Sequence, residues 1–241
     1  LTNYNMVIFA KSGAGKSVTM KTLISRSSLL MGIESLALDA EGEYEIVAES
    51  LGGINVVLSP NSKTVINLFD VETETAKDEI TGRERLVLNI ENKVEDVTQS
   101  LLTMARGSTR SEEVNELTKQ IIAEAVAEEY TRCGITADPS SLYVNGQMGR
   151  LGNIGREKKE MPTIGSWYKT LLKKAEENTD ENYTFHYSYL KKVMKQYVRE
   201  LNGQMAYFDG QSTFDLLEGI PFINLDISQL EERFARPLAQ Q

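Results

Sequence analysis

The sequence has very few of the residues that build metal clusters and disulfide bonds. In 241 residues there is one cysteine, Cys133, and one histidine, His186. A single cysteine cannot form an internal disulfide, and this pair alone cannot supply a tetrahedral metal site. A lone reduced cysteine is typical of cytoplasmic proteins, so we expect a cytoplasmic location.

Long apolar runs and an excess of basic residues are also missing. No apolar segment approaches the roughly 20 residues that cross a bilayer, so any membrane association is expected to come through partner proteins. Aspartate and glutamate outnumber lysine and arginine by 35 to 26, which gives a net charge of −9. Because nucleic-acid affinity depends mainly on cations that neutralise phosphates, this charge disfavours direct nucleic-acid binding.

The N-terminal part of the chain alternates short apolar runs with helical segments. Strands buried on both faces are expected at the apolar runs 5–10, 35–39 and 55–58. Helices are expected from Lys16 to Met31, where Gly32 follows as a stop, and from Tyr44 to Leu51. This alternation predicts a parallel sheet with crossover helices.

From about Asp70 onwards the pattern is helical, until a strand is expected again at the apolar run 220–226. Apolar residues recur at helical spacing within 164–175 and within 190–201. We therefore expect an α/β fold in which an all-α subdomain interrupts the sheet core. The expected domains are a first part of the core at 1–70, the inserted subdomain at 71–205 and the return to the core at 206–241.

Two smaller features of the helical part can be placed from the sequence. Ser111 is expected to cap a helix that carries Val114 on its apolar stripe and stops at Gly134. The glycines and polar residues between 138 and 160 predict a mobile loop.

The segment 10–17, AKSGAGKS, matches the phosphate-binding loop that joins a strand to a helix, with Ala10 in place of the leading glycine. Gly13 and Gly15 permit a backbone that turns N–H groups toward an anion, and the helix beginning near Lys16 adds its positive end. Lys16 is expected to act on the β- and γ-phosphates, and the Ser17 hydroxyl to ligate Mg²⁺. The residues expected to bind ATP with Mg²⁺ are Ser12, Gly13, Ala14, Gly15, Lys16, Ser17 and Val18. An ordinary glycine-rich turn is the alternative.

Acidic partners for the metal are expected at the ends of strands. Asp39 and Asp226 each close an apolar run, and the carboxyl ends of parallel strands share one edge of a sheet. Asp39 leads into the acidic stretch that contains Glu41 and Glu43. The structural alternatives are a turn residue for Asp39 and a helix N-cap for Asp226.

Several stretches of the chain together resemble the conjugative-transfer ATPases of type IV secretion systems, the TraC/TrbE-like traffic ATPases. The stretches that carry the resemblance are 11–17, 38–44, 51–53, 66–70, 161–163, 208–212 and 225–230. The phosphate loop is common to many families, whereas the sequence DAEGEY at 39–44, in order with the others, is much more specific.

The resemblance implies a RecA-like P-loop NTPase core with an inserted all-α lobe, related to the FtsK/HerA group. It implies an ATPase at the cytoplasmic base of a secretion channel, which energises pilus assembly and substrate transfer and works as a hexamer with other channel subunits. It argues against Asp226 as the Walker B aspartate. We also expect Glu41 to lie near the γ-phosphate, directly or through water, as a catalytic residue. The Walker B strand is expected beyond Gln241, and because the chain begins at Leu1 we expect it to be part of a longer protein.

Three other functions stay open at this point. One is a DNA-translocating motor of the FtsK/HerA type, which the acidic charge disfavours. Another is a nucleotide-binding interaction domain that does not turn ATP over. A P-loop kinase is the weakest alternative, because the sequence contains no recognisable acceptor site.

Overall fold

The computed structural model describes residues 5–59, 64–77, 84–107, 114–144, 157–213 and 220–230. These residues form two compact units. The sheet unit contains the described residues up to Thr64 together with 220–230, and the helical unit contains those from Val65 to 213. The fold is α/β, with a parallel sheet and helices.

The sheet unit contains three parallel strands in the order β1-β5-β2. The strands are β1 (Ser35–Asp39), β2 (Ile54–Val57) and β5 (Phe222–Asp226). The central strand is therefore the one that comes last in the chain, and Asp39 of β1 lies directly opposite Asp226 of β5. The expected strands at 35–39, 55–58 and 220–226 are confirmed, with shifts of one or two residues at two of them.

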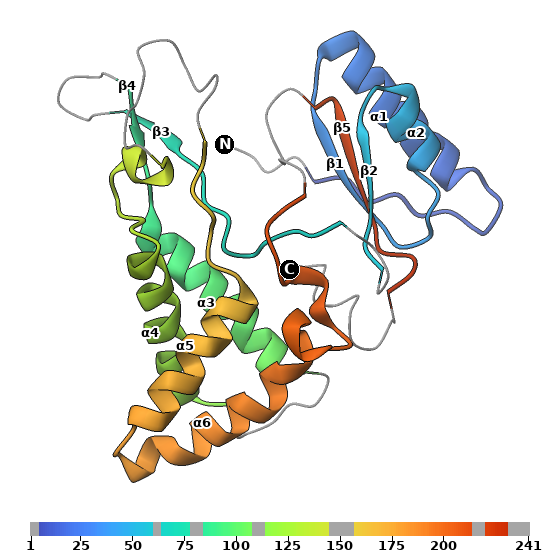
Figure 1. Ribbon diagram of the computed structural model, residues 1–241. Coiled ribbons are helices and arrows are strands. Elements are labelled where there is room, and N and C mark those ends of the chain that lie inside the picture. The colour runs from blue at the N-terminus through green and yellow to red at the C-terminus, as the bar shows by residue number, and fades with distance from the viewer. Residues whose placement is uncertain are drawn as a thin grey trace. The chain divides into compact units, whose positions relative to one another are not determined.

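Two helices cover one face of this sheet, α1 (Lys16–Met31) and α2 (Glu45–Ser50), as Figure 1 shows. Val47 and Ala48 of α2 pack on Phe222 of β5, and Ile24 of α1 and Ala37 of β1 pack against this cluster. Both helices confirm the sequence-based expectation, and Gly32 ends α1 in the left-handed conformation at φ 63°. Both helices thus lie on the same side of the sheet, but only α2 connects two of the described strands, β1 and β2.

The strand expected at 5–10 is wrong. These residues belong to no strand, and Phe9 is 91% exposed. An apolar run becomes a strand only where a neighbour pairs with its backbone, and none of the described strands pairs with this segment. The apolar pattern alone therefore overestimated the order of the chain before the loop.

The helical unit is built around four helices, α3 (Ile90–Arg106), α4 (Glu116–Arg132), α5 (Ile164–Glu177) and α6 (Glu181–Met194). Each of the four helices contributes large apolar side chains that are fully buried. The side chains at the centre of this core are Leu101, Ile121, Ile122, Trp167, Leu171, Leu190 and Met194. Tyrosine hydroxyls around this core donate hydrogen bonds to backbone carbonyl groups. Tyr130, for example, donates to the Phe69 carbonyl at 2.8 Å.

The part of the chain expected to be all helical also contains a hairpin. Strands β3 (Glu74–Lys77) and β4 (Glu84–Val87) pair antiparallel. Their side chains are mostly exposed, so the alternation that marks a half-buried strand is weak in the sequence. Local backbone pairing, rather than an apolar face, forms this hairpin.

The ends of the helices differ in detail from the expectations. Asn115, not Ser111, caps α4, and its side-chain oxygen accepts the N–H groups of Leu117 and Thr118; Ser111 lies outside the described residues. The helix expected over 190–201 is regular only to the end of α6 and continues as short 3-10 turns at Lys195–Tyr197 and Arg199–Leu201. Further 3-10 turns lie at Pro139–Leu142 and Ala206–Phe208, while most of the expected loop, 145–156, is outside the described residues.

Candidate functional site

The loop before α1 has the backbone that its glycines permit. Gly13 and Gly15 adopt φ values of 77° and 86°, in the left-handed region that side chains with a Cβ rarely enter. Inside the loop the Ala14 N–H donates to the Lys11 carbonyl at 3.0 Å. This N–H is therefore used within the turn. In this conformation the Ala14 N–H does not point at the expected anion site, and Ala14 serves only to connect Gly13 with Gly15.

The start of α1 presents N–H groups that have no hydrogen-bond partner among the described residues. Gly15 is the N-cap and provides no side-chain cap, and the first turn contains no acidic residue. The first helical bond joins the Thr19 N–H to the Gly15 carbonyl, so the N–H groups of 16–18 precede the hydrogen-bonded ladder. Unsatisfied N–H groups and the positive helix end together attract an anion.

The expected ligand residues lie around this helix end. Lys16 is the first residue of α1 and is exposed, while Ser17 is half-buried in the first turn. Val18 is 67% exposed, and Ser12 lies in the turn before the helix. Nothing in this arrangement conflicts with a phosphate and Mg²⁺, and their binding stays a prediction.

A second feature is the tight turn that follows β1. Its organiser is Asp39, which is only 2% exposed. Asp39 Oδ1 accepts the N–H groups of Glu41 at 3.1 Å and Gly42 at 2.9 Å, and its Oδ2 accepts the N–H of Tyr44 at 2.9 Å. Glu41 itself is exposed, at the outer part of this turn. We call 39–44 the acidic turn.

The acidic turn and α1 are linked directly. The ammonium of Lys21, in the N-terminal half of α1, lies 5.6 Å from the ring centre of Tyr44. Burial raises the pKa of Tyr44, and the nearby charges of Asp39 and Glu43 raise it further. Because Tyr44 ends the acidic turn and starts α2, this contact places the first half of α1 beside the carboxyl edge of β1.

Asp226 ends β5 at the same edge. Its Oδ1 accepts the Ser228 N–H at 2.8 Å, which is the geometry of an aspartate that stabilises a turn. No helix follows it among the described residues, so the alternative of a helix N-cap is not what the structure shows. Asp226 therefore holds its own turn rather than the acidic turn.

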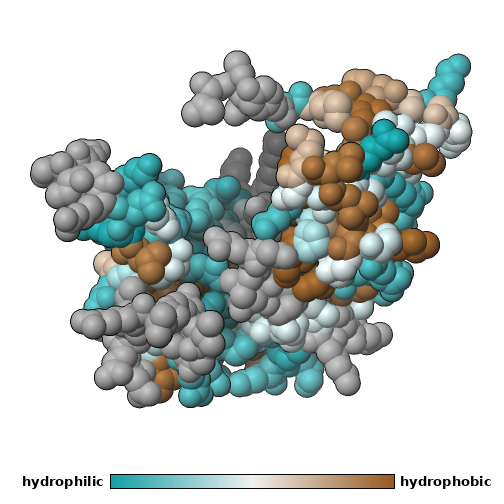
Figure 2. Space-filling view, turned by 90° about the horizontal axis from the view of Figure 1, so that it is seen from above, coloured by the Kyte–Doolittle hydropathy of each residue, from teal (hydrophilic) through white to brown (hydrophobic). Residues whose placement is uncertain are grey.

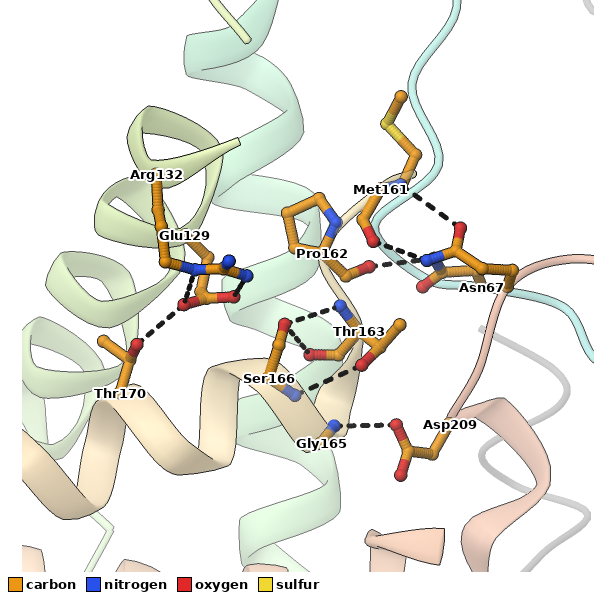
Figure 3. Close-up of polar contacts among 11 residues, drawn as sticks. Asn67, Glu129, Arg132, Met161, Pro162, Thr163, Gly165, Ser166, Thr170 and Asp209 are labelled. Carbon is orange, nitrogen blue, oxygen red and sulfur yellow. Dashed lines mark hydrogen bonds and ion pairs between the residues drawn. The ribbon is translucent and has the colours of Figure 1, made fainter. Parts of the chain in front are cut away.

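Three further stretches that carry the family resemblance, 66–70, 161–163 and 208–212, converge in the helical unit (Figure 3). The Asn67 side chain donates to the Pro162 carbonyl at 2.8 Å, and the Gln211 amide exchanges two hydrogen bonds with the backbone of Met161. Asp209, 4% exposed, accepts the N–H groups of Gly165 and Arg199, both at 2.7 Å. These polar groups join the chain before α3, before α5 and after α6. Their role is architectural.

Sequence reasoning gave these residues no role of their own. The signal that was available is Asn67 within the otherwise apolar stretch 65–69, where a buried amide needs partners, whereas Asp209 and Gln211 lie in a polar stretch. That pattern predicts buried hydrogen bonds but does not identify the partners.

One buried carboxylate in the helical unit was also missed. Glu129 of α4 accepts a two-pronged contact from Arg132, at 3.0 and 2.7 Å, and a hydrogen bond from Thr170 at 2.6 Å. Burial alone would raise the pKa of Glu129, but the hydrogen bonds from Arg132, Ser166 and Thr170 outweigh it and hold this pKa below its ordinary value. Glu129 thus belongs to the packing of α4 on α5.

Two features are absent from the part of the chain that the structure describes: a membrane-spanning helix and a cluster of metal ligands. None of the described helices is both long and apolar enough to span a bilayer. The described residues also contain no group of three or more His, Cys, Asp or Glu side chains placed to hold a metal ion.

Comparison with known proteins gives a family and a fold. Curated proteins offer no match. Among solved structures, VirB4 of Thermoanaerobacter pseudethanolicus is similar over 92% of this chain, with a TM-score of 0.59 and 22% identity. The chain spans 50% of that VirB4 chain, and at this identity the likeness shows the fold.

The sequence itself matches the family model described as the central domain of helicase HerA, over residues 3–160. This span includes the loop before α1, the acidic turn and helices α3 and α4. The resemblance to a HerA-related family is thereby confirmed. The chain belongs to the family of the helicase HerA central domain.

Proposed function

We propose that this chain is the nucleotide-binding part of an ATPase with a RecA-like core. The observation that carries the proposal is the exposed start of α1, which has two left-handed glycines before it, no side-chain cap and no acidic residue in its first turn. The N–H groups of residues 16–18 and the ammonium of Lys16 would hold the β- and γ-phosphates of ATP. Ser17 would ligate Mg²⁺.

Glu41 is proposed as the catalytic carboxylate that polarises the attacking water. It is exposed on the acidic turn, and the Lys21–Tyr44 contact ties that turn to α1. An exposed carboxylate at this edge is free to meet a water molecule at the terminal phosphate. Bound Mg²⁺ would supply charge neutralisation at the phosphates.

The machine that uses this ATPase is proposed to be a type IV secretion or conjugation channel. The fold of VirB4 and the TraC/TrbE-like stretches support this assignment. The proposed protein works in the cytoplasm as a hexamer, bound to the membrane through other channel subunits. The proposed domain limits remain 1–70, 71–205 and 206–241.

A motor that moves on DNA is the second candidate, because the family model that the chain matches is described as the central domain of a helicase. The net charge of −9 argues against strong binding of this chain to a nucleic-acid backbone. Salt titration of DNA binding by the full-length protein separates the two functions. A DNA motor predicts an affinity that falls steeply as salt rises, whereas the secretion ATPase predicts weak binding at all salt concentrations.

The proposal is tested by calorimetric titration of Mg·ATP into the full-length protein and its Lys16→Ala variant. Loss of a charge-assisted phosphate contact is expected to weaken binding about 10- to 100-fold. Arg26→Ala is the matched control, because it removes one exposed positive charge from the same helix away from the loop. Equal affinities of Lys16→Ala and the wild type would overturn the proposal.

Turnover is tested separately by phosphate release. Glu41→Gln is expected to reduce kcat about 100-fold or more while ATP still binds, since general acid–base catalysis typically contributes that much. A wild-type protein that binds ATP but releases no phosphate would instead support the nucleotide-binding domain without turnover.

A further inference from the structure

The carboxylate of Asp39 is fully engaged. An ionised carboxylate has about four acceptor positions on its two oxygens. In Asp39 they meet the N–H groups of Glu41, Gly42 and Tyr44 and the Nδ2 of Asn224, the last at 3.3 Å. With these positions filled and the residue 2% exposed, Asp39 has no lone pair directed at a metal ion or a phosphate.

Asn224 ties this carboxylate to the middle of the sheet. It is fully buried in β5, and its Nδ2 donates to Asp39 Oδ2 and, at 2.8 Å, to Asn55 Oδ1 of β2. The ionised Asp39 carboxylate can only accept, so the reversed Asn224 amide would set its Oδ1 against Asp39 Oδ2. The orientation of the amide is thereby fixed, even though Asn224 Oδ1 has no hydrogen-bond partner among the described residues.

A polar row therefore crosses all three strands, from Asn55 through Asn224 to Asp39. Buried polar rows of this kind cost desolvation and are retained where they fix one arrangement of the chain. What this row fixes is the backbone of the acidic turn, because Asp39 binds three of its N–H groups. The Glu41 side chain is left outside the row and exposed.

We propose that Asp39 and Asn224 are positioning residues for Glu41, and that Asp39 is not a ligand of the nucleotide or its metal. The proposal rests on the function proposed above for Glu41. It also assigns a role to β5, because the strand that returns after the helical unit carries the amide that orients the turn. Contacts made by the turn are then set before any nucleotide binds.

The test compares Asp39→Asn with Asp226→Asn in the full-length protein. The two aspartates end neighbouring strands and lie opposite each other, but only Asp39 binds the N–H groups of the acidic turn. An asparagine at position 39 keeps the shape and loses acceptors on one side. Amide hydrogen exchange at Glu41, Gly42 and Tyr44 is expected to accelerate about tenfold in Asp39→Asn and to stay unchanged in Asp226→Asn.

Steady-state kinetics provides the second measurement. In Asp39→Asn, kcat is expected to fall at least about tenfold while KM for ATP changes less than about twofold, because the loop before α1 is untouched. Asn224→Ala, which removes the amide without altering any charge, is expected to shift kcat in the same direction.

Three results would overturn the proposal. Weaker Mg·ATP binding by Asp39→Asn with unchanged exchange in the turn would make Asp39 a ligand. Faster exchange with unchanged kcat would mean that catalysis by Glu41 does not depend on an ordered backbone in the acidic turn. Equal acceleration of exchange in Asp226→Asn would mean that Asp39 stabilises the acidic turn no more than Asp226 does. If the wild type binds ATP without hydrolysing it, the function proposed for Glu41 fails, while the exchange contrast still decides whether Asp39 holds the turn.

Discussion

The two units of this chain bury their apolar residues to very different extents. In the helical unit, Trp167 and Leu171 of α5 have no exposed surface. In the sheet unit, α1 contains no buried residue at all, and Leu30 is 80% exposed. Hydrophobic side chains are correspondingly prominent on the surface of the sheet unit in Figure 2, whereas the coloured surface of the helical unit in that view is mostly hydrophilic.

The difference follows from how apolar residues are distributed along the helices. In α5 they recur on one stripe, which can meet α4 and α6 in a closed core. In α1 they are spread around the helix, and only some of them, such as Ile24, reach the sheet. On β1, Leu36 and Leu38 alternate with Ala37, so they occupy the sheet face away from the helices, where they are 65% and 43% exposed. Local structure and burial are thus set by different features of the sequence.

The largest effect is expected where burial is complete. Leu171→Ala removes a side chain with no exposed surface and should destabilise the helical unit by about 2–5 kcal/mol. Trp167 is the only tryptophan and lies in the same core, so its fluorescence reports the unfolding of this unit in denaturant. A loss below about 1 kcal/mol would show that the core can relax around the cavity.

A close backbone approach should give the next largest effect, in each unit separately. A Cβ at Gly53 would overlap the carbonyl oxygen of Phe222, and one at Gly203 would overlap that of Gln196. Replacing either glycine with alanine should cost about 1–3 kcal/mol through forced shifts of the backbone. Hydrogen exchange of β5 should detect Gly53→Ala, and Trp167 fluorescence should detect Gly203→Ala. Loss of stability in the other unit alone would contradict the assignment of these contacts.

The third prediction uses the buried carboxylate of the helical unit. Because the pKa of Glu129 is lowered in the folded state, its contribution to stability is present at neutral pH and is lost as the pH falls below about 4.3, the ordinary value for glutamate. Glu129→Gln should cost about 1–3 kcal/mol at pH 7 and flatten the acid side of the stability profile. Parallel profiles for the two proteins, followed by Trp167 fluorescence, would rule Glu129 out as the titrating group.

Most local elements could be predicted from the sequence because their signals are local. The helix from Lys16 to Met31 appears with the expected limits, because Gly15 and Gly32 mark its two ends. The strand at 35–39 follows from an apolar run that finds a partner in β5. The equally apolar run at 5–10 fails because pairing depends on residues far away in the sequence, which a run of side chains does not specify.

The candidate site was predictable to the same extent. The residue types of the loop before α1 indicated left-handed glycines, and Gly13 and Gly15 adopt that conformation. The role of Asp39 was left open between turn and nucleotide, since its partner Asn224 lies 185 residues away. Residues 66–70, 161–163 and 208–212 could be recognised by resemblance, but their mutual hydrogen bonds depend on tertiary structure.

The smallest effect is expected on the exposed face of the sheet unit, and it decides what that exposure means. Leu30 is 80% exposed in α1, so Leu30→Ala should change stability by no more than about 0.5 kcal/mol, as surface substitutions usually do. Hydrogen exchange of β5 in the full-length protein measures the effect of Leu30→Ala. The matched variant in a closed core is Leu171→Ala, whose effect is measured by Trp167 fluorescence. If Leu30→Ala were to cost as much as Leu171→Ala, the apolar surface of α1 would be covered in the full-length protein, because an uncovered leucine has little burial energy to lose. The contrast between the two units would then reflect a missing cover rather than a difference in their packing.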